Sequence, residues 1–290
     1  MFRGGWRVRV RRMRISVGDL VLDAIDAGPA DGEPVLLLHG FPQSSHSWRG
    51  VTPLLAGAGL RVVAPDLRGY SPDARPAGAE AYRMAHLLED VTAVLDQIGG
   101  SAHVVGHDWG AAIAWQLAAR YPERVRSLTA VSVPHPLAFV AALRTDADQR
   151  ERSLYMRDFA SAGCEDRLLT DDAANLRAFF TGAGEAVDID HVLSVVGDPK
   201  VLRHCLDYYT AASLQDMVGL GAVTVPTLHV WSDQDQALGA AGARATGDYV
   251  TGPYRFEVFE GVTHWIPEEA PERLADLILE QIRSVANSSV

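Results

Sequence analysis

The stretch HVVGHDWGAAIAW, residues 103–115, decides the fold. It begins as a short apolar run, typical of a buried strand, and ends as an alanine-rich segment that favours a helix packed closely on a sheet. Between the two, Gly106 and Gly110 flank Asp108, so the chain can turn sharply and expose the central side chain. The outline is one that usually presents a nucleophilic serine, but here the residue is an aspartate. The same position also suits an aspartate that caps the helix, so the motif alone leaves two interpretations.

Strands and helices alternate around this stretch. The runs PVLLLHG (34–40), RVVAPD (61–66) and VRSLTAVSVP (125–134) predict further strands, and helical patterns lie between them. Alternation of this kind predicts a parallel sheet with right-handed crossovers.

The alternation stops after the strand at 125–134. Residues 136–218 form helical patterns with no strand between them, and the strands then resume with TLHVWSD and YRFEVFEG. An amphipathic segment, PERLADLILEQIRSVA, closes the chain as a helix. We therefore expect an α/β core made of residues 14–135 and 219–290, interrupted by a helical cap at 136–218.

The composition limits the function. The chain has 290 residues, 48% of them hydrophobic, and a net charge of −11. A nucleic-acid partner is not expected, since that binding depends on Lys and Arg neutralising phosphates. No apolar run approaches the roughly 18 residues of a membrane span. The two cysteines, Cys164 and Cys205, are too few for a disulfide framework, and a reducing, cytoplasmic location is expected.

The N-terminus is basic, with six arginines in the first fourteen residues. We expect residues 1–13 to be a disordered tail. The segment ISVGDLVLDAID, residues 15–26, alternates like a strand, and its three aspartates argue against a secretory signal.

Polar residues follow several of the predicted strands. Asp108, Asp235 and His264 occur in the order nucleophile, acid, histidine, which is one known arrangement of a catalytic triad. The carboxyl ends of parallel strands meet at one edge of a sheet, so these side chains are expected to lie together. Asp233, two residues before Asp235, is an equally polar rival, and a lone histidine such as His264 is often structural.

A second segment, LLLHGFPQSSHSW (36–48), has a glycine-containing turn after a strand. Such a turn can present the Phe41 N–H beside the Trp109 N–H, and two such donors make an oxyanion hole. Pro42 keeps Phe41 out of the α region, which suits a fixed geometry. The alternative is a plain loop between a strand and a helix.

These segments together resemble the α/β-hydrolase fold and, within it, the epoxide hydrolases, from about Arg14 to the C-terminus. HGFPQSSHSW, APDLRGYS, GHDWGA, VWSDQDQAL and GVTHW are each similar to a family segment, although Ser232 stands where the family usually has glycine. In the family's acid segment the acid is the residue before x-x-L. The resemblance therefore selects Asp235 over Asp233.

Epoxide hydrolases also carry two cap tyrosines that hold the epoxide oxygen. RSLYMRDF resembles the first tyrosine segment and implies Tyr155, and CLDYYTAA resembles the second and implies Tyr209. Asp207 and Thr210 depart from the second pattern, and Tyr208 would face elsewhere if the segment is helical. Either tyrosine could instead be a core residue with its hydroxyl at the surface.

The resemblance implies an epoxide hydrolase. Asp108 would attack the ring, Tyr155 and Tyr209 would protonate the leaving oxygen, and His264, oriented by Asp235, would activate water against the resulting ester. The expected substrate contacts come from these residues: His39, Pro42, Trp109, Tyr155, Tyr209 and Trp265.

Two rival functions remain open. A haloalkane dehalogenase uses the same aspartate ester but expels halide, and Trp109 fits it better than Phe41 does. A non-catalytic ligand-binding protein of this fold would keep the pocket without needing the three catalytic residues. No metal or cofactor is expected, the partners would be an epoxide and water, and the sequence leaves a homo-oligomer open.

Overall fold

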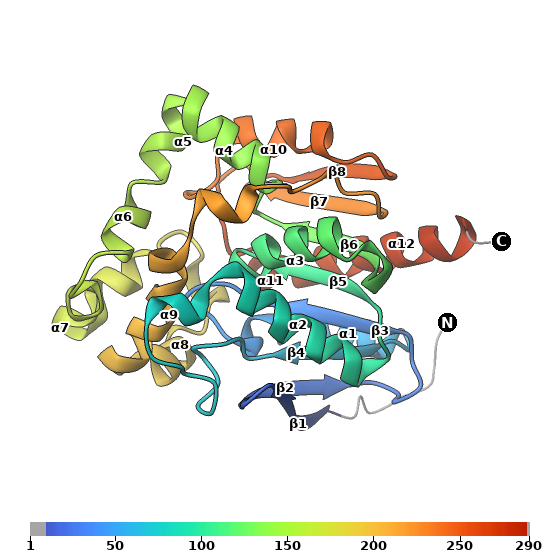
Figure 1. Ribbon diagram of the computed structural model, residues 1–290, viewed down its shortest axis with the longest axis horizontal. Coiled ribbons are helices and arrows are strands. Elements are labelled where there is room, and N and C mark those ends of the chain that lie inside the picture. The colour runs from blue at the N-terminus through green and yellow to red at the C-terminus, as the bar shows by residue number, and fades with distance from the viewer. Residues whose placement is uncertain (1–9, 289–290) are drawn as a thin grey trace.

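The computed structural model describes residues 10–288 and contains an eight-stranded sheet (Figure 1). The strand order is β1-β2-β4-β3-β5-β6-β7-β8. The two pairs β1–β2 and β2–β4 are antiparallel, and every later pair is parallel. The strands are β1 (Val10–Val17), β2 (Leu20–Ala27), β3 (Pro34–Leu38), β4 (Arg61–Pro65), β5 (Ala102–His107), β6 (Val125–Val131), β7 (Thr227–Ser232) and β8 (Tyr254–Phe259). The predicted α/β-hydrolase fold is confirmed.

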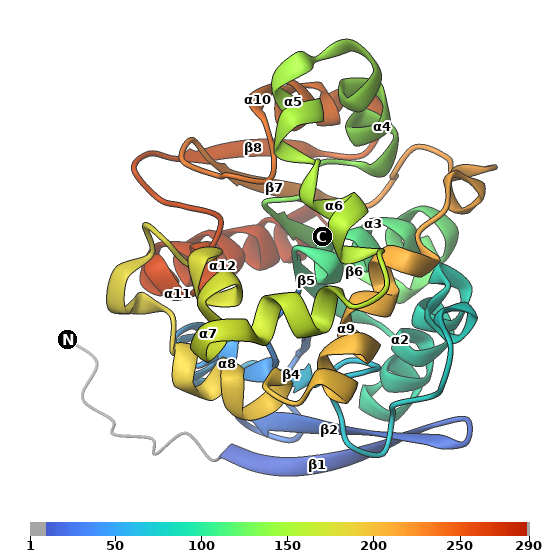
Figure 2. The same cartoon turned by 90° about the vertical axis from the view of Figure 1, so that its left-hand side faces the viewer.

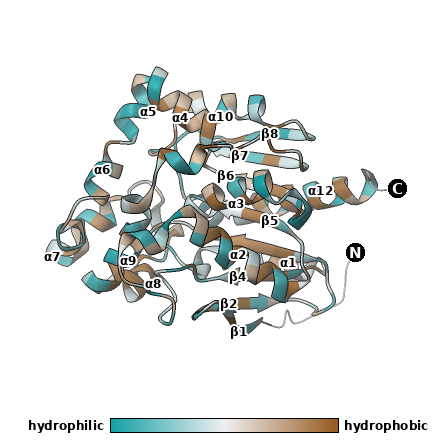
Figure 3. Cartoon of the chain, viewed as in Figure 1, coloured by the Kyte–Doolittle hydropathy of each residue, from teal (hydrophilic) through white to brown (hydrophobic). Residues whose placement is uncertain are grey.

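Helices cover both faces of the sheet because its central strands are buried throughout. All five residues of β3 and all six of β5 are buried. In Figure 3, hydrophobic colour predominates on the central strands and hydrophilic colour on the outer turns of α5 and α7. The helices of the core are η1 (Ser45–Trp48), α1 (Val51–Gly57), η2 (Ala79–Tyr82), α2 (Met84–Ile98), α3 (Trp109–Arg120), η3 (Pro122–Arg124), α10 (Ala240–Ala245), η6 (Thr246–Tyr249), α11 (Ile266–Glu269) and α12 (Pro271–Ser288).

The N-terminal prediction needs two corrections. Residues 10–13, assigned to a disordered tail over 1–13, form the first half of β1 and pair with β2. Residues 1–9 lie outside the described residues. The segment at 15–26 is not one strand but the end of β1, a turn and most of β2, since Gly18, at a φ of +59°, lets the chain reverse between the two strands.

The helical insertion between β6 and β7 contains no strand within its described residues. Its helices are α4 (Pro136–Thr145), α5 (Ala147–Arg152), α6 (Tyr155–Phe159), α7 (Cys164–Ala178), η4 (Gly184–Ala186), α8 (Ile189–Val196), α9 (Pro199–Ala211) and η5 (Leu214–Met217). Figure 2 looks onto this insertion, with α6, α7, α8 and α9 in front of the sheet. α7 is interrupted at Thr170, after which Asp171, Asp172 and Ala173 all adopt left-handed backbone angles. Among the described helices, none is long and apolar enough to cross a membrane.

Candidate active site

The turn between β5 and α3 holds Asp108 in a conformation that few non-glycine residues adopt, with φ +51° and ψ −121°. The turn closes tightly because its flanking residues lack side chains. A Cβ on Gly106 would meet the backbone of Gly110, and a Cβ on Gly110 would meet the backbone of Leu38. The Asp108 carboxylate makes no capping bond to α3, so it is available for another purpose.

The two carboxylate oxygens of Asp108 face different groups. The Phe41 N–H donates to Oδ1 over 2.8 Å, and Oδ2 lies 3.6 Å from Nε2 of His264. Gly40 allows this approach, since a Cβ there would collide with the Asp108 side chain. Trp109, the first residue of α3, brings a second backbone N–H to the same turn. The residue that follows β5 is therefore surrounded by groups that follow β3 and β8.

His264 is held on its other side by Asp235. The distance from His264 Nδ1 to Asp235 Oδ2 is 2.8 Å, and both side chains are buried. The Ala237 and Leu238 N–H groups donate to Asp235 Oδ1 over 2.8 and 2.9 Å, which fixes the carboxylate. The rival Asp233 is exposed and accepts the Gly261 N–H, so it does not contact the histidine.

The charges of these groups depend on each other. Burial disfavours a charged imidazole, but the Asp235 and Asp108 carboxylates outweigh burial and raise the pKa of His264 to about 10. Burial alone would raise the pKa of Asp108, yet the hydrogen bond and charge of His264 hold it below its ordinary value. Asp108 is therefore an ionised carboxylate near neutral pH, and His264 is cationic while Asp108 keeps its charge.

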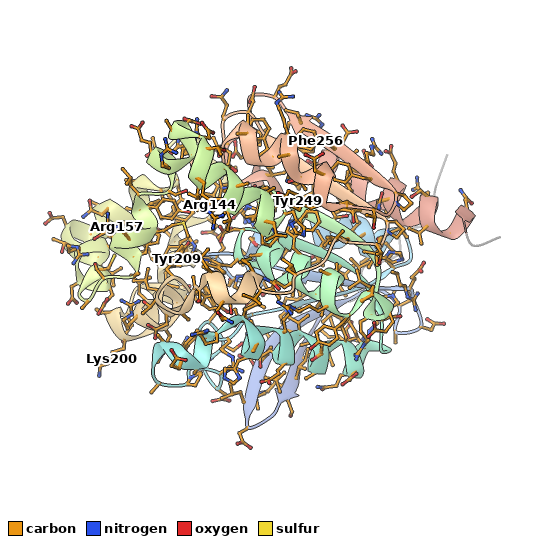
Figure 4. All side chains as sticks on the ribbon, turned by 45° about the horizontal axis from the view of Figure 1, so that its top comes forward. Arg144, Arg157, Lys200, Tyr209, Tyr249 and Phe256 are labelled. Atoms are coloured by element: carbon orange, nitrogen blue, oxygen red, sulfur yellow. The ribbon has the colours of Figure 1, made fainter. Side chains whose placement is uncertain are left out.

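Two tyrosines of the insertion lie over Asp108. Tyr155 begins α6 and Tyr209 lies in α9, and their ring centroids are 6.1 Å apart. Figure 4 shows Tyr209 inward of Arg157 and Lys200, which lie at the outer edge. Burial, followed by the charge of Asp108, raises the pKa of each phenol above its ordinary value, so both hydroxyls keep their protons.

The neighbouring Tyr208 points elsewhere. Its hydroxyl donates to the Arg68 carbonyl oxygen over 2.8 Å, and its side chain lines neither cavity at the site. The helical spacing of α9 thus points the two adjacent tyrosines in different directions.

Asp108, Tyr155 and Tyr209 lie at the junction of two cavities, of about 270 and 150 Å³. His264 lines only the smaller cavity. The larger cavity is mostly apolar and extends between α3, α4 and η5. Its lining includes Met84, Trp109, Phe139, Val140, Leu143 and Met217. The smaller cavity is mainly aromatic, and its lining includes Phe41, Pro42, Phe159, Phe179, Gln236 and Trp265.

The expected substrate contact of His39 is wrong. His39 is fully buried and lines neither cavity. Its Nε2 accepts the Leu67 N–H over 3.0 Å, and its Nδ1 lies 3.0 Å from the Gly40 carbonyl oxygen. The ring braces the loop after β3, which explains why a histidine precedes the glycine. Pro42, Trp109 and Trp265 do line the cavities.

Several residues of the site had no sequence signal. Phe159 and Phe179 line the smaller cavity from the insertion, where aromatic residues at helical spacing look like ordinary core residues. His107, directly before Asp108, has its Nε2 2.9 Å from the His264 carbonyl oxygen. Its place in the strand motif could have drawn notice, but its contact with His264 depends on the fold.

Known proteins are similar to this chain in fold and in sequence over most of its length. A family model described as alpha/beta hydrolase fold matches residues 33–271. The AB hydrolase superfamily protein YfhM of Bacillus subtilis is 31% identical, covering 93% of this chain and 97% of its own. Epoxide hydrolase 4 of Mus musculus is 30% identical, covering 92% of this chain and 77% of its own. The crystal structure of a Bacillus megaterium epoxide hydrolase with an inhibitor superposes with a TM-score of 0.85, at 29% identity, covering 93% of this chain and all of that one.

Proposed function

The chain belongs to the α/β-hydrolase fold family and, within it, to the epoxide hydrolases, and we propose that it opens an epoxide to a vicinal diol through a covalent ester on Asp108. One observation carries this mechanism. The ionised carboxylate of Asp108 lies where a backbone donor, a histidine and two protonated tyrosines converge. The helical insertion, residues 136–218, acts in this proposal as the cap that supplies the tyrosines.

The first step is attack of Asp108 on a ring carbon. A carboxylate is already a nucleophile near neutral pH, since its reference pKa is about 3.9, so no base is needed. The Phe41 N–H occupies Oδ1, which leaves Oδ2 to form the new bond. The C–O bond of the ring breaks, and the oxygen takes a proton from Tyr155 or Tyr209. Such a positioned acid is typically worth about 10²–10⁴ in rate.

The second step is hydrolysis of the ester. Esterification removes the negative charge of Asp108, which is one of the two charges that raise the pKa of His264. The pKa of His264 then falls, so the imidazolium gives up its proton, which restores the tyrosine that protonated the ring oxygen. The neutral imidazole can then take a proton from water while Asp235 stabilises the cation that forms, and that proton is passed on to the departing diol oxygen. Hydroxide adds to the Asp108 carbonyl carbon, and the oxyanion stays on Oδ1, where the Phe41 N–H already donates and the Trp109 N–H can join it. Release of the diol restores the carboxylate with one oxygen from water.

The test is the intact mass of the His264→Gln variant after incubation with a mixed panel. The panel contains styrene oxide, phenyl glycidyl ether, cyclohexene oxide, bromobutane and chlorohexane. We expect an adduct equal in mass to a whole epoxide, mapped to Asp108 by peptide sequencing, and none in the variant that also carries Asp108→Ala.

The other outcomes are equally clear. An adduct equal to a haloalkane minus its hydrogen halide would make the protein a dehalogenase. A folded variant that takes up no adduct, from a wild-type chain without turnover, would favour a ligand-binding protein of this fold.

For the location, we propose the cytoplasm, because Cys164 and Cys205 are buried as separate thiols.

A further inference from the structure

A polar cluster with two buried members and one exposed arginine lies beside the catalytic groups and has no part in the two steps above. It consists of Gln43, Arg49 and Glu268. The Gln43 Nε2 donates to Glu268 Oε2, and Arg49 Nη1 donates to Glu268 Oε1 over 2.9 Å. The Glu268 side chain is only 3% exposed, and Gln43 is 1% exposed. A buried carboxylate is costly unless it is paired and hydrogen-bonded, so this one needs a reason.

Gln43 belongs to the turn that presents the oxyanion donor. Its N–H donates to the Gly40 carbonyl oxygen over 3.0 Å, which closes the turn around Phe41 and Pro42. The other polar atom of its side chain, Oε1, is buried and has no partner among the described residues. Within the described chain, Glu268 is therefore the only side chain that anchors Gln43.

Glu268 belongs to the segment that carries the base. Its N–H donates to the Trp265 carbonyl oxygen over 3.0 Å in the first turn of α11, directly after His264. The bond between Gln43 and Glu268 therefore joins two segments. One segment brings the Phe41 N–H to Oδ1 of Asp108, and the other brings His264 to Oδ2.

Arg49 extends the connection to the insertion. Its Nη2 donates to the Ala186 carbonyl oxygen in η4, while its Nη1 holds Glu268. The segment just before η4 packs on the base segment as well, since the rings of Phe180 and Trp265 are 4.5 Å apart. One carboxylate thus links the oxyanion turn, the histidine segment and the insertion.

We propose that Glu268 is a positioning residue for hydrolysis of the ester, acting through Gln43 on the Phe41 N–H. The inference rests on the proposed ester mechanism. Glu268 and Gln43 line neither cavity, so neither touches the reacting atoms. Their effect falls mainly on the second step, because that step creates a full negative charge on the oxygen that the Phe41 N–H must hold.

A matched set of variants tests this role. Glu268→Gln keeps the size but leaves one acceptor oxygen for the two donors, Gln43 and Arg49, and Gln43→Met removes the hydrogen bond from the other side. The double variant Gln43→Glu with Glu268→Gln restores a carboxylate–amide pair in the reverse order. Glu272→Gln, at an exposed position of α12, is the control for loss of one acidic charge.

Rapid-quench intact mass measures the formation and the decay of the ester separately. The probe is the panel epoxide that labels Asp108 fastest. Loss of a complete oxyanion donor costs about 10²–10³ in rate, and a displaced donor costs less, so we expect Glu268→Gln and Gln43→Met each to slow ester decay roughly tenfold. Ester formation should stay within about twofold of wild type, the double variant should recover most of the decay rate, and Glu272→Gln should match wild type in both steps.

Two results would overturn the role of Glu268 while leaving the proposed function intact. One is wild-type ester decay in folded Glu268→Gln and Gln43→Met. The other is an equal slowing of both steps, which indicates a general distortion of the site rather than an effect on the oxyanion donor. If Glu268→Gln does not fold, Gln43→Met decides by the same two rates. If even the wild-type and His264→Gln chains form no ester, the proposed function fails and this inference fails with it.

Discussion

The two sides of Asp108 are built in opposite ways. On the core side, the Phe41 N–H and His264 contact its two oxygens, and Asp235 is held in turn by two backbone N–H groups. On the insertion side, the contacts among Tyr155, Phe159, Phe179 and Tyr209 are between aromatic rings, with centroids 5.0 to 6.2 Å apart. The core therefore positions charge through directional bonds, whereas the insertion positions two hydroxyls by packing.

This difference predicts how each side responds to substitution. Hydrogen bonds between buried charges are directional and depend on every partner, so a change on the core side should stop a step. An aromatic pair contributes only about 0.5–1.5 kcal/mol beyond its buried area, and a neighbouring ring can replace part of it. Changes on the insertion side should then alter a rate without stopping it.

The largest effect is expected from Asp108→Ala. The variant has no nucleophile, so turnover should fall by more than about 10⁴, the upper end of the usual contribution of a single acid or base. Steady-state hydrolysis of the panel epoxides measures it, with the circular dichroism spectrum as the check on folding. More than a few per cent of wild-type activity would show that Asp108 does not form the ester.

The next effect is expected from Tyr155→Phe and Tyr209→Phe. Each removes one proton donor and keeps the ring. Because a positioned acid is worth about 10²–10⁴ in rate, single-turnover ester formation should slow about 10–100-fold in each variant. The double variant should form the ester more slowly still. Tyr208→Phe is the matched control on the same helix, because its hydroxyl bonds the Arg68 carbonyl oxygen away from the cavities. Unchanged ester formation in both single variants would remove the tyrosines from the mechanism.

A smaller effect concerns the stability of the core and its dependence on pH. His229 is fully buried in β7, and burial lowers its pKa to about 4. The unfolded chain takes up this proton near its reference pKa of about 6.5, so the stabilisation is complete above that pH and is lost as the pH falls toward 4. The shift corresponds to at most about 3 kcal/mol.

Replacement of this histidine tests the sign. The His229→Gln variant should lose less of its unfolding free energy between pH 7 and pH 4.5 than the wild type, although it starts from a lower value, because one buried group no longer takes up a proton on unfolding. Urea unfolding at several pH values measures it. His86→Gln, at an exposed position of α2, should keep the wild-type slope. An unaltered slope in His229→Gln would place the acid sensitivity elsewhere.

The difference between the core side and the insertion side of Asp108 also determines what the sequence could predict. The residues after β5, β7 and β8 could be expected to meet, because parallel strands end at one edge and the glycines around Asp108 report a tight turn. The function of His39 could not be predicted, since its position before Gly40 fits both a substrate contact and a brace for the loop. Tyr155 and Tyr209 came from resemblance alone. Their approach to Asp108 depends on how the insertion packs, which no local pattern encodes.

Backbone conformation gives the smallest expected effect and the last comparison. In the core, left-handed angles at non-glycine residues occur, within the described chain, only at Asp108 and Ser132, both beside catalytic groups. The insertion has three in succession. One of them, Asp171, is exposed, makes no side-chain hydrogen bond to another described residue and lines neither cavity. Strain at Asp108 serves the site, whereas strain at Asp171 has no such function.

Asp171→Gly should therefore stabilise the protein and leave its activity unchanged. A left-handed angle costs a residue with a side chain about 1–2 kcal/mol, and the greater freedom of glycine in the unfolded chain returns roughly 0.4–1 kcal/mol of that, so the net gain is about 0.5–1 kcal/mol. Urea unfolding midpoints measure it. Asp166→Gly, on an ordinary helical turn of α7, should instead lose up to about 1 kcal/mol. A loss in both variants would mean that Asp171 stabilises its turn, and the insertion would then depend on directional contacts, as the core does.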